Sequence, residues 1–364
     1  AGDVDMIVAV TYSDEVNMVA CQVAHSLFEV PTKIARVRHQ SYLNPIWADL
    51  FSRDHMPIDV IISPEIEVGR AISRRLHVPG AFDTIPLADG IVQLLGVRCA
   101  DDCPLLNTPL RQLTELFPDL HLTIVGIVRN GEGFVPSSSD HMLPKDEVYF
   151  VCESAQVLRV MAAFGHEEPE ARRIIILGGG NIGRFLAREI EEHRPGVSAR
   201  IIEFDKDRAH LAAQGLDRTV VLHGDALDPE ILEEASVATA EAVIAVTNDD
   251  EVNILASLLA KRYGAKKAMT LINNVTYSPL ITTLGIDVVV SPRAITVSTI
   301  LQHIRRGRIR AAHAVHDDFG EIMEAEAMET SSLVGVPIRE AGLPDGVLIG
   351  AIIRDGKVIT PTGS

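Results

Sequence analysis

Apolar and polar positions divide most of the chain into two kinds of segment. Short continuous apolar runs are typical of strands buried on both faces of a sheet. Between them, apolar residues recur at helical spacing, as at Ile182, Leu186 and Ile190. The strands expected in the second half span 174–177, 200–202, 219–222, 242–246, 267–271 and 287–290. Their alternation with helices predicts an α/β fold with a doubly wound, Rossmann-like parallel sheet.

Part of this pattern occurs twice. Residues 9–20 (AVTYSDEVNMVA) and 245–256 (AVTNDDEVNILA) are identical at eight of twelve positions. Three further pairs of similar segments follow in the same order: 61–72 with 289–300, 106–113 with 334–341, and 124–136 with 348–361. Four blocks in order over more than a hundred residues indicate a tandem duplication.

The two copies do not begin and end at equivalent points. The strand and glycine loop at 173–183 would have their first-copy counterpart before residue 1, and the strand expected at 146–152 has no counterpart after residue 364. We therefore expect the first Rossmann-like unit to be truncated at its N-terminus and the chain to be an internal fragment of a larger two-repeat protein.

Each Rossmann-like unit is followed by a module of another type. Asn130-Gly131 and Asp355-Gly356 lie between short β-branched runs, and these dipeptides favour type I′ hairpin turns. Each tail is therefore expected to be a small α+β module. The predicted domains are 1–80, the C-terminal half of the first Rossmann-like domain; 81–153, the first module; 154–171, a linker helix; 172–306, the second Rossmann-like domain; and 307–364, the second module, incomplete.

The glycine loop of the second copy carries the clearest functional signal. Gly178, Gly180 and Gly183 directly follow a buried strand and open a helix. In this arrangement the first glycine permits a tight turn, the second lets the backbone approach a pyrophosphate, and the third lets helix and strand pack closely. Glu203, twenty residues after Gly183, ends the next strand, where a carboxylate can accept hydrogen bonds from both ribose hydroxyls and repel a 2′-phosphate. The pattern predicts dinucleotide binding, with NAD favoured over NADP. The alternative is an empty Rossmann-like fold with vestigial glycines.

Two later strand ends complete the candidate site. Ligands of doubly wound sheets bind at the carboxyl ends of the strands. We expect Asp225 and Ala226 to lie at the adenine, and Thr247 and Asn248 at the diphosphate or the far half of the ligand. For Thr247 and Asn248 the alternative is plain helix capping.

Composition excludes several classes of function. The 364 residues include 33 Lys+Arg and 50 Asp+Glu, a formal charge of −17, which argues against sequence-independent nucleic-acid binding. The sequence contains neither a long uninterrupted apolar window nor a signal-peptide pattern, so we expect a cytosolic protein without direct membrane insertion. The four cysteines give no metal-ligand framework and are expected to be ordinary reduced thiols; no metal site is predicted.

An NAD-dependent oxidoreductase is the competing interpretation. Tyr263 and Lys267 match the Y-x-x-x-K pair of short-chain dehydrogenases, which requires both side chains on one helical turn. Gly264, however, is expected to end the helix, and Lys267 to open the next strand. The sequence shows no His/Asp pair or serine nucleophile elbow, so we predict no catalytic residues.

The motifs GGGNIG (178–183), HGDA (223–226), AVTNDDEVN (245–253) and SPR (291–293), each Rossmann-like unit being followed by a hairpin module, closely resemble the TrkA family. These are peripheral regulatory subunits of bacterial Trk potassium-uptake systems, built from two RCK (regulator of potassium conductance) repeats. The resemblance implies a homotetrameric cytosolic ring on the inner face of the membrane. It also implies binding of NAD(H) or ATP/ADP and gating of a TrkH- or TrkG-type potassium channel subunit. By motif position, Gly178, Gly180, Asn181, Ile182 and Gly183 would surround the diphosphate, Glu203 the ribose, and Asp225 with Ala226 the adenine. The first copy lacks the glycine loop, so a nucleotide site there is expected to be incomplete.

Overall fold

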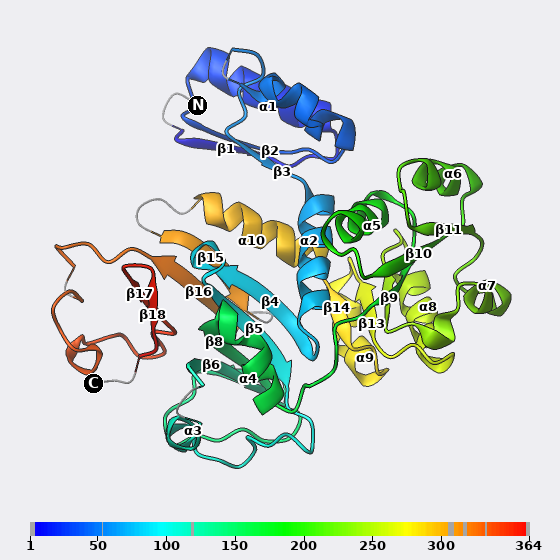
Figure 1. Cartoon of the computed structure of the whole chain (residues 1–364). Helices are drawn as coiled ribbons and strands as arrows, with labels where there is room; N and C mark the ends of the chain where they lie inside the picture. Colours follow the sequence, from blue (N-terminus) through cyan, green and yellow to red (C-terminus); the bar gives the residue numbers. More distant parts are fainter. Residues whose placement is uncertain are drawn as a thin grey trace. The chain divides into compact units, whose positions relative to one another are not determined.

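Corresponding parts of the two sequence copies fold together. The computed structural model describes residues 4–52, 54–117, 120–304, 309–315, 319–331 and 333–361 (Figure 1). One unit combines Ala1–Ser73 with Arg172–Arg306, and the other combines Arg74–Ala171 with Gly307–Ser364. We call them the Rossmann unit and the hairpin unit.

The second copy in the Rossmann unit forms a six-stranded, fully parallel sheet in the order β11-β10-β9-β12-β13-β14. The strands are β9 (Arg173–Leu177), β10 (Ser198–Glu203), β11 (Val220–His223), β12 (Ala242–Ala245), β13 (Ala268–Leu271) and β14 (Val288–Val290). Each lies within two residues of the strand expected from the apolar runs, and the parallel, doubly wound topology confirms the predicted fold class. The strand order reverses between β9 and β12, where such sheets bind their ligands.

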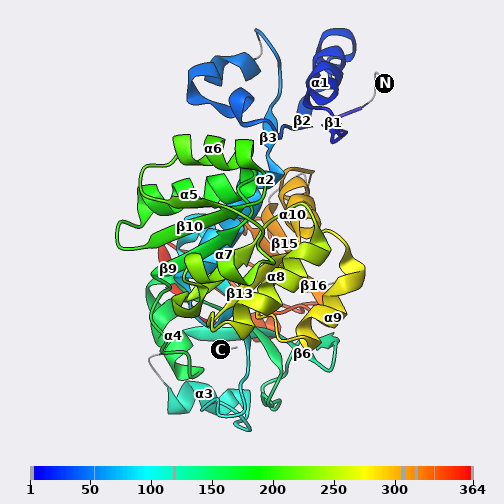
Figure 2. The ribbon, with the colours of Figure 1, turned by 90° about the vertical axis from the view of Figure 1, so that its right-hand side faces the viewer.

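Helices cover both faces of this sheet. The helices of the second copy in this unit are α5 (Asn181–His193), α6 (Lys206–Gln214), α7 (Pro229–Glu234), η5 (Val237–Thr239), α8 (Asp250–Arg262), η6 (Val275–Tyr277), α9 (Ser278–Thr283) and α10 (Pro292–Ile304). Figure 2 shows α5 and α6 on one side of β9 and β10, and α7 and α8 on the other. On the latter side, Ile175 and Leu177 of β9 share a core with Leu232 of α7 and Ala256 of α8.

The first copy contributes a three-stranded parallel sheet, β1-β2-β3, to the Rossmann unit. Its elements are β1 (Met6–Ala9), α1 (Asp14–Phe28), β2 (Thr32–Arg36), η1 (Gln40–Leu43), η2 (Pro45–Phe51), β3 (Val60–Ile62) and α2 (Pro64–His77). By the sequence offset, these strands are the counterparts of β12, β13 and β14. Helix α2 packs against the second copy: a Cβ built on Gly69 would lie 2.3 Å from the ring of Phe185 in α5.

The hairpin unit is built on a five-stranded antiparallel sheet in the order β4-β5-β8-β6-β7. Its first-copy elements are β4 (Ala81–Leu87), η3 (Ala88–Gly90), β5 (Val92–Arg98), α3 (Leu110–Leu116), β6 (Leu122–Arg129), β7 (Glu132–Phe134), β8 (Glu147–Glu153), η4 (Ser154–Gln156) and α4 (Val157–Ala163). Those of the second copy are β15 (Ile309–Val315), β16 (Gly320–Ala325), η7 (Ile338–Glu340), β17 (Ile352–Arg354) and β18 (Lys357–Ile359). Asn130 and Asp355 have φ of 54° and 51° and the glycines after them 85° and 72°, which confirms both predicted type I′ turns.

The helix observed here is shorter than the linker helix expected over 154–171. Helix α4 ends at Ala163, because Gly165 adopts φ +91° and a polar segment containing Pro169 follows. Its buried residues Val160 and Met161 belong to the core of the first module. The helix is therefore part of that module.

The two hairpin modules share a second apolar core. Phe319 of the second module lies over the first-module sheet, so close that a Cβ on Gly126 or Gly133 would lie within 2.5 or 2.2 Å of its ring. Val315, Ile322 and other second-module side chains join this core with residues of β5, β6 and β8. Glycines in these strands therefore make room for an aromatic ring.

Candidate dinucleotide site

The point at which the strand order reverses brings the glycine loop next to the end of β12. Gly178 follows β9 directly and has φ +109°, a conformation that favours glycine. A Cβ on Gly178 would also lie 3.1 Å from the backbone nitrogen of Thr247. The structure thus places Gly178 and Thr247 side by side.

The other two glycines have opposite surroundings. A Cβ on Gly183 would lie 2.0 Å from the carbonyl oxygen of Gly178 and 3.3 Å from Ile176, so only glycine lets α5 approach β9 this closely. Around Gly180, the N-cap of α5, no atom lies within 4 Å of the Cβ position. The Cβ position of Gly180 is therefore open, which leaves room for a ligand to approach the backbone.

The start of α5 faces this same open space. The first N–H groups of a helix have no intrahelical acceptor, and the helix dipole adds positive potential. The side chain of Asn181 accepts a hydrogen bond from Arg184 (2.9 Å), and Asn181 and Ile182 are both partly exposed. The chemistry of this helix end suits an anion such as a diphosphate.

Glu203 is hydrogen-bonded directly to the glycine loop. It is only 5% exposed at the end of β10, and its carboxylate accepts hydrogen bonds from the backbone N–H of Gly179 (2.6 Å) and of Asp205 (2.9 Å). A carboxylate has about four lone-pair sites, so two acceptor positions are left for ribose hydroxyls. The contact with Gly179 is absent from the sequence prediction, because residue spacing does not show which N–H a carboxylate meets.

The end of β11 lies next to Glu203. The N–H of Gly224 donates to the carbonyl of Glu203 (3.0 Å), which places Asp225 and Ala226 beside the acid. The exposed Asp225 accepts from the N–H of Leu227 (2.9 Å), whereas Ala226 is buried. Phe204, which sequence reasoning also missed, is 73% exposed directly after Glu203.

Thr247 takes part in a clamp between strand and helix. Its hydroxyl donates to the Oδ1 atom of Asn253 in α8 (2.7 Å), and its own N–H donates to the same oxygen (2.9 Å). Asn253 is fully buried and donates in turn to the carbonyls of Thr247 (3.1 Å) and Leu271 (3.0 Å). We call this Thr–Asn network, which ties the ends of β12 and β13 to α8, the strand–helix clamp.

The capping alternative for Thr247 and Asn248 is wrong. The N-cap of α8 is Asp249, whose carboxylate accepts from the N–H of Val252 (2.9 Å). Thr247 supports this cap by accepting from the N–H of Asp249 (3.2 Å). The side chain of Asn248 is exposed at the carboxyl edge of the sheet.

The first copy contains the same clamp. The hydroxyl of Thr11 donates to Asn17 (2.7 Å), which is fully buried and donates to the carbonyls of Thr11 (3.1 Å) and Arg36 (2.9 Å). The most similar sequence block of the two copies therefore has a structural function in each.

The dehydrogenase pair does not form. Helix α8 ends at Arg262, Tyr263 is its C-cap, and Gly264 follows with φ +110°. Lys267 lies beyond this turn and pairs through its carbonyl with the N–H of Val243 in β12 (2.8 Å). Tyr263 and Lys267 therefore do not share a helical turn.

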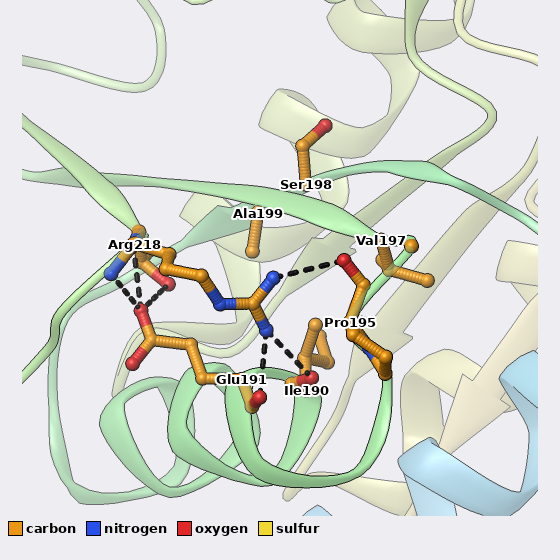
Figure 3. Close-up of a pocket in the computed structure, with 9 residues that line it drawn as sticks. Ile190, Glu191, Pro195, Val197, Ser198, Ala199 and Arg218 are labelled. Atoms are coloured by element: carbon orange, nitrogen blue, oxygen red, sulfur yellow. Dashed lines mark hydrogen bonds between the residues drawn. The ribbon is translucent and has the colours of Figure 1, made fainter.

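A hollow at the opposite edge of the sheet is lined by the charged side chains of Glu191 and Arg218, and both have hydrogen-bond partners (Figure 3). It lies where α5 ends and β10 begins. Glu191 accepts hydrogen bonds from the N–H groups of Asp217 (3.0 Å), Arg218 (2.7 Å) and Thr219 (2.6 Å) and from the hydroxyl of Thr219 (2.8 Å). The guanidinium of Arg218 donates to the carbonyls of Glu191 (2.6 Å) and Pro195 (3.1 Å). Burial would raise the pKa of Glu191, but these hydrogen bonds outweigh it and lower the pKa. These hydrogen bonds therefore stabilise the end of α5, and both charged side chains already have partners within the chain.

The part of the chain that the structure describes contains neither a cluster of metal-ligating side chains nor a membrane-spanning helix. It contains no group of three or more His, Cys, Asp or Glu side chains arranged to hold a metal ion. None of its helices combines the length and apolarity needed to cross a bilayer.

Comparison with known proteins agrees with the repeat pattern. The TrkA-N domain model matches residues 1–64 and 174–292, and the TrkA-C domain model matches residues 94–165. The Trk system potassium uptake protein TrkA of Azorhizobium caulinodans is 55% identical over 359 residues, covering 99% of this chain and 78% of the relative. The protein of the same name from Halomonas elongata is 41% identical over 360 residues, covering 98% and 78%.

Solved structures support the fold. The crystal structure of the GsuK RCK domain has a TM-score of 0.59 at 21% identity, covering 82% of this chain and 61% of that one. The GsuK channel bound to NAD has a TM-score of 0.58 at 21% identity, covering 82% and 51%. The domain matches and the two curated relatives show that the chain belongs to the TrkA family of Trk system potassium uptake proteins.

Proposed function

We propose that this chain is the regulatory subunit of a Trk-type potassium-uptake system and that it binds an adenine dinucleotide as a signal, without transforming it. The observation that carries this proposal is the contrast among the three glycines. Gly178 and Gly183 are required by contacts within the chain, but Gly180 borders only open space at a helix N-terminus.

The residues present fit NAD(H). The diphosphate would lie against Gly178, Gly180 and the N–H groups of Asn181, Ile182 and Gly183, and Glu203 would accept from the ribose hydroxyls. Asp225 and Ala226 would border the adenine, next to the exposed ring of Phe204, and Thr247 and Asn248 the far half of the ligand. Across the sheet the strand ends lie in the order β11, β10, β9, β12, which corresponds to adenine, ribose, diphosphate and the far half of the ligand. ADP and ATP share the adenosine and diphosphate and are expected at the same site.

The carboxylate of Glu203 also predicts discrimination against NADP. A 2′-phosphate would come close to a negative charge at a position where NADP-binding sites offer an arginine. Arg208 lies 3.8 Å from Glu203, and its side chain is 55% exposed. Arg208 is the side chain that would accommodate the extra phosphate. Binding of NADPH therefore tests whether the repulsion by Glu203 outweighs the attraction by Arg208.

An NAD-dependent oxidoreductase is the second candidate. The open helix N-terminus at Gly180 provides a place for the dinucleotide, but Tyr263 and Lys267 are separated by a turn. The described residues near the glycine loop supply no other acid/base pair for hydride transfer. We therefore favour the sensor.

Regulation would work through a shift in population between arrangements of the subunit. A ligand that spans β10, α5 and β12 favours the arrangement it binds more tightly, and it shifts the equilibrium only by that difference in affinity. A homotetrameric ring at the inner face of the membrane would transmit the shift to a TrkH- or TrkG-type channel subunit.

An exposed apolar stripe on α1 supports assembly into such a ring. Val16, Val19, Val23 and Leu27 follow each other at helical spacing on α1 and are each between 41% and 71% exposed. Tyr12, two residues before the helix, is 92% exposed. A contiguous apolar surface of this kind usually marks a protein–protein contact. Analytical ultracentrifugation of the parent chain and of a Val19→Glu variant tests this part of the proposal, because the charge should dissociate the oligomer.

Calorimetric titration tests the ligand. We expect NADH, NAD⁺, ADP and ATP to bind the full chain and NADPH to bind more weakly. NADH should not be oxidised when small carbonyl compounds are added. Failure of every adenine nucleotide to bind would refute the proposal, and steady NADH oxidation would establish the enzyme instead.

A further inference from the structure

Two of the four cysteines lie together beneath a short exposed turn in the hairpin unit. Cys99 directly follows β5, and the turn closes when the N–H of Cys103 donates to the carbonyl of Ala100 (3.2 Å). Residues 100–102 are exposed, whereas Cys99 and Cys103 are 2% and 5% exposed. The two thiols are therefore buried directly beneath an exposed turn.

The two thiols lie on either side of this turn and belong to the same apolar core. The neighbouring Cys99 thiol is the main cause that lowers the pKa of Cys103, aided by the N–H of Leu105 and opposed by burial. The neighbouring Cys103 thiol, followed by burial, raises the pKa of Cys99. Cys103 is thus the more acidic thiol of the pair.

The other two cysteines have different surroundings. Burial raises the pKa of Cys21 to about 11 and that of Cys152 to about 12. Both thiols stay protonated at neutral pH, and a protonated thiol is a poor nucleophile. They provide internal controls for the reactivity of the pair.

We propose that Cys99 and Cys103 form an oxidation site, at which a small hydroperoxide such as hydrogen peroxide converts the two thiols into an intramolecular disulfide. The sulfur of Cys103 attacks one peroxide oxygen, the O–O bond breaks, and hydroxide leaves as Cys103 becomes a sulfenic acid. The sulfur of Cys99 then attacks that sulfur, the S–O bond breaks, and the proton of Cys99 leaves with the hydroxide as water. In sum, two thiols and one hydrogen peroxide give one disulfide and two waters, and a dithiol reductant reverses the change.

The position of the pair links its oxidation to α4. Cys99, Cys103 and Phe164, the C-cap of α4, belong to one core. Pro104, directly after Cys103, lies 3.5 Å from where a Cβ of Gly165 would be. A disulfide that tightens the turn therefore acts on the core that holds the end of this helix.

The test uses the full-length chain treated with hydrogen peroxide, alkylated with N-ethylmaleimide under denaturing conditions and digested with trypsin. Cleavage after Arg98 and Arg111 places both thiols in one peptide, 99–111, and Cys152 in another, 146–159. We expect peptide 99–111 to lose two hydrogen atoms and take up no label, and to take up two labels after dithiothreitol. Its oxidation should accelerate as pH rises through a range below that of an ordinary thiol.

Two variants serve as controls. Cys152→Ser should leave the disulfide unchanged, and Cys103→Ser should abolish it and leave Cys99 free for labelling. Peptide 99–111 that still takes up two labels after peroxide has oxidised Cys21 would overturn the proposal. A disulfide joining peptides 99–111 and 146–159 would overturn it equally. The parent chain alone distinguishes these results, so the test does not depend on the variants folding.

Discussion

Replacing single glycines of the loop by alanine distinguishes glycines required for stability of the fold from glycines required for nucleotide binding. The Cβ of Gly180→Ala enters open space, whereas the Cβ of Gly183→Ala would lie 2.0 Å from the carbonyl oxygen of Gly178. We expect the first change to weaken nucleotide binding and spare the fold, and the second to destabilise the fold itself.

The structure gives the size of each effect. At Gly180, φ is −69°, so alanine gains about 0.4–1 kcal/mol from the less flexible unfolded chain. As an N-cap it loses a similar amount, roughly 0.5–1 kcal/mol, so the free energy of unfolding should change by less than about 1 kcal/mol. At Gly183 the helix must move away from β9, and such overpacking costs about 1–3 kcal/mol. A methyl group between Gly180 and a bound diphosphate costs a similar amount of binding energy, roughly a 5- to 150-fold loss of affinity.

Urea unfolding and calorimetric titration of NADH provide the two measurements. Gly180→Ala should unfold close to the parent and bind NADH at least about fivefold more weakly, by the estimate above. Gly183→Ala should unfold at clearly lower urea. If Gly180→Ala binds NADH as tightly as the parent, the diphosphate does not approach Gly180, and the steric argument for the site is refuted.

Three further changes test the supporting structure. Asn253→Ala leaves buried groups of the strand–helix clamp unpaired and should cost about 1–3 kcal/mol of stability in urea, whereas Asn248→Ala, at an exposed position, should stay within about 0.5 kcal/mol. Because the folded-state pKa of Glu191 is lowered, its ionised form stabilises the fold above the ordinary glutamate pKa, and this contribution is lost as pH falls through the lowered value. Glu191→Gln should therefore unfold more easily than the parent at neutral pH, and the difference should shrink towards about pH 3; an equal difference at both pH values would contradict the assignment. Gly133→Ala would push a Cβ into the ring of Phe319, so its melting temperature should fall, by an overpacking cost of about 1–3 kcal/mol.

Much of the Rossmann unit could be predicted from the sequence because its signals are local. Strands buried on both faces appear as continuous apolar runs, so β9 and β12 were located to within a residue. The tight turn at Gly178 and the close packing at Gly183 each impose glycine through nearby backbone atoms. Such constraints leave a mark on the residue type itself.

Contacts between residues far apart in the sequence could not be predicted in this way, because they do not restrict the residue type. The bond from the N–H of Gly179 to Glu203 joins two strand ends, and spacing alone does not distinguish it from a free carboxylate. The linker helix was expected to reach residue 171 although its apolar spacing ends at Phe164, and the observed end of α4 depends on the positive φ of Gly165. The cap at Asp249 was missed because Thr247, Asn248 and Asp249 are all good capping residues in sequence, and only the clamp to Asn253 fixes which one begins the helix.

The duplication offers a way to separate structural residues from binding residues. Thr11 and Thr247 are shared by the copies because each holds an asparagine of the following helix, and their polar atoms are already paired. The position after them differs: Tyr12 in the first copy and Asn248 in the second, both exposed. An exposed position between a fixed clamp and a fixed cap can change without harm to the fold, so its residue type is free to follow what it contacts. A tyrosine at the end of an apolar stripe suits a protein surface, and an amide beside a glycine loop suits a polar ligand. Within the copies it is therefore the differing exposed residues, more than the shared ones, that should determine what each binds.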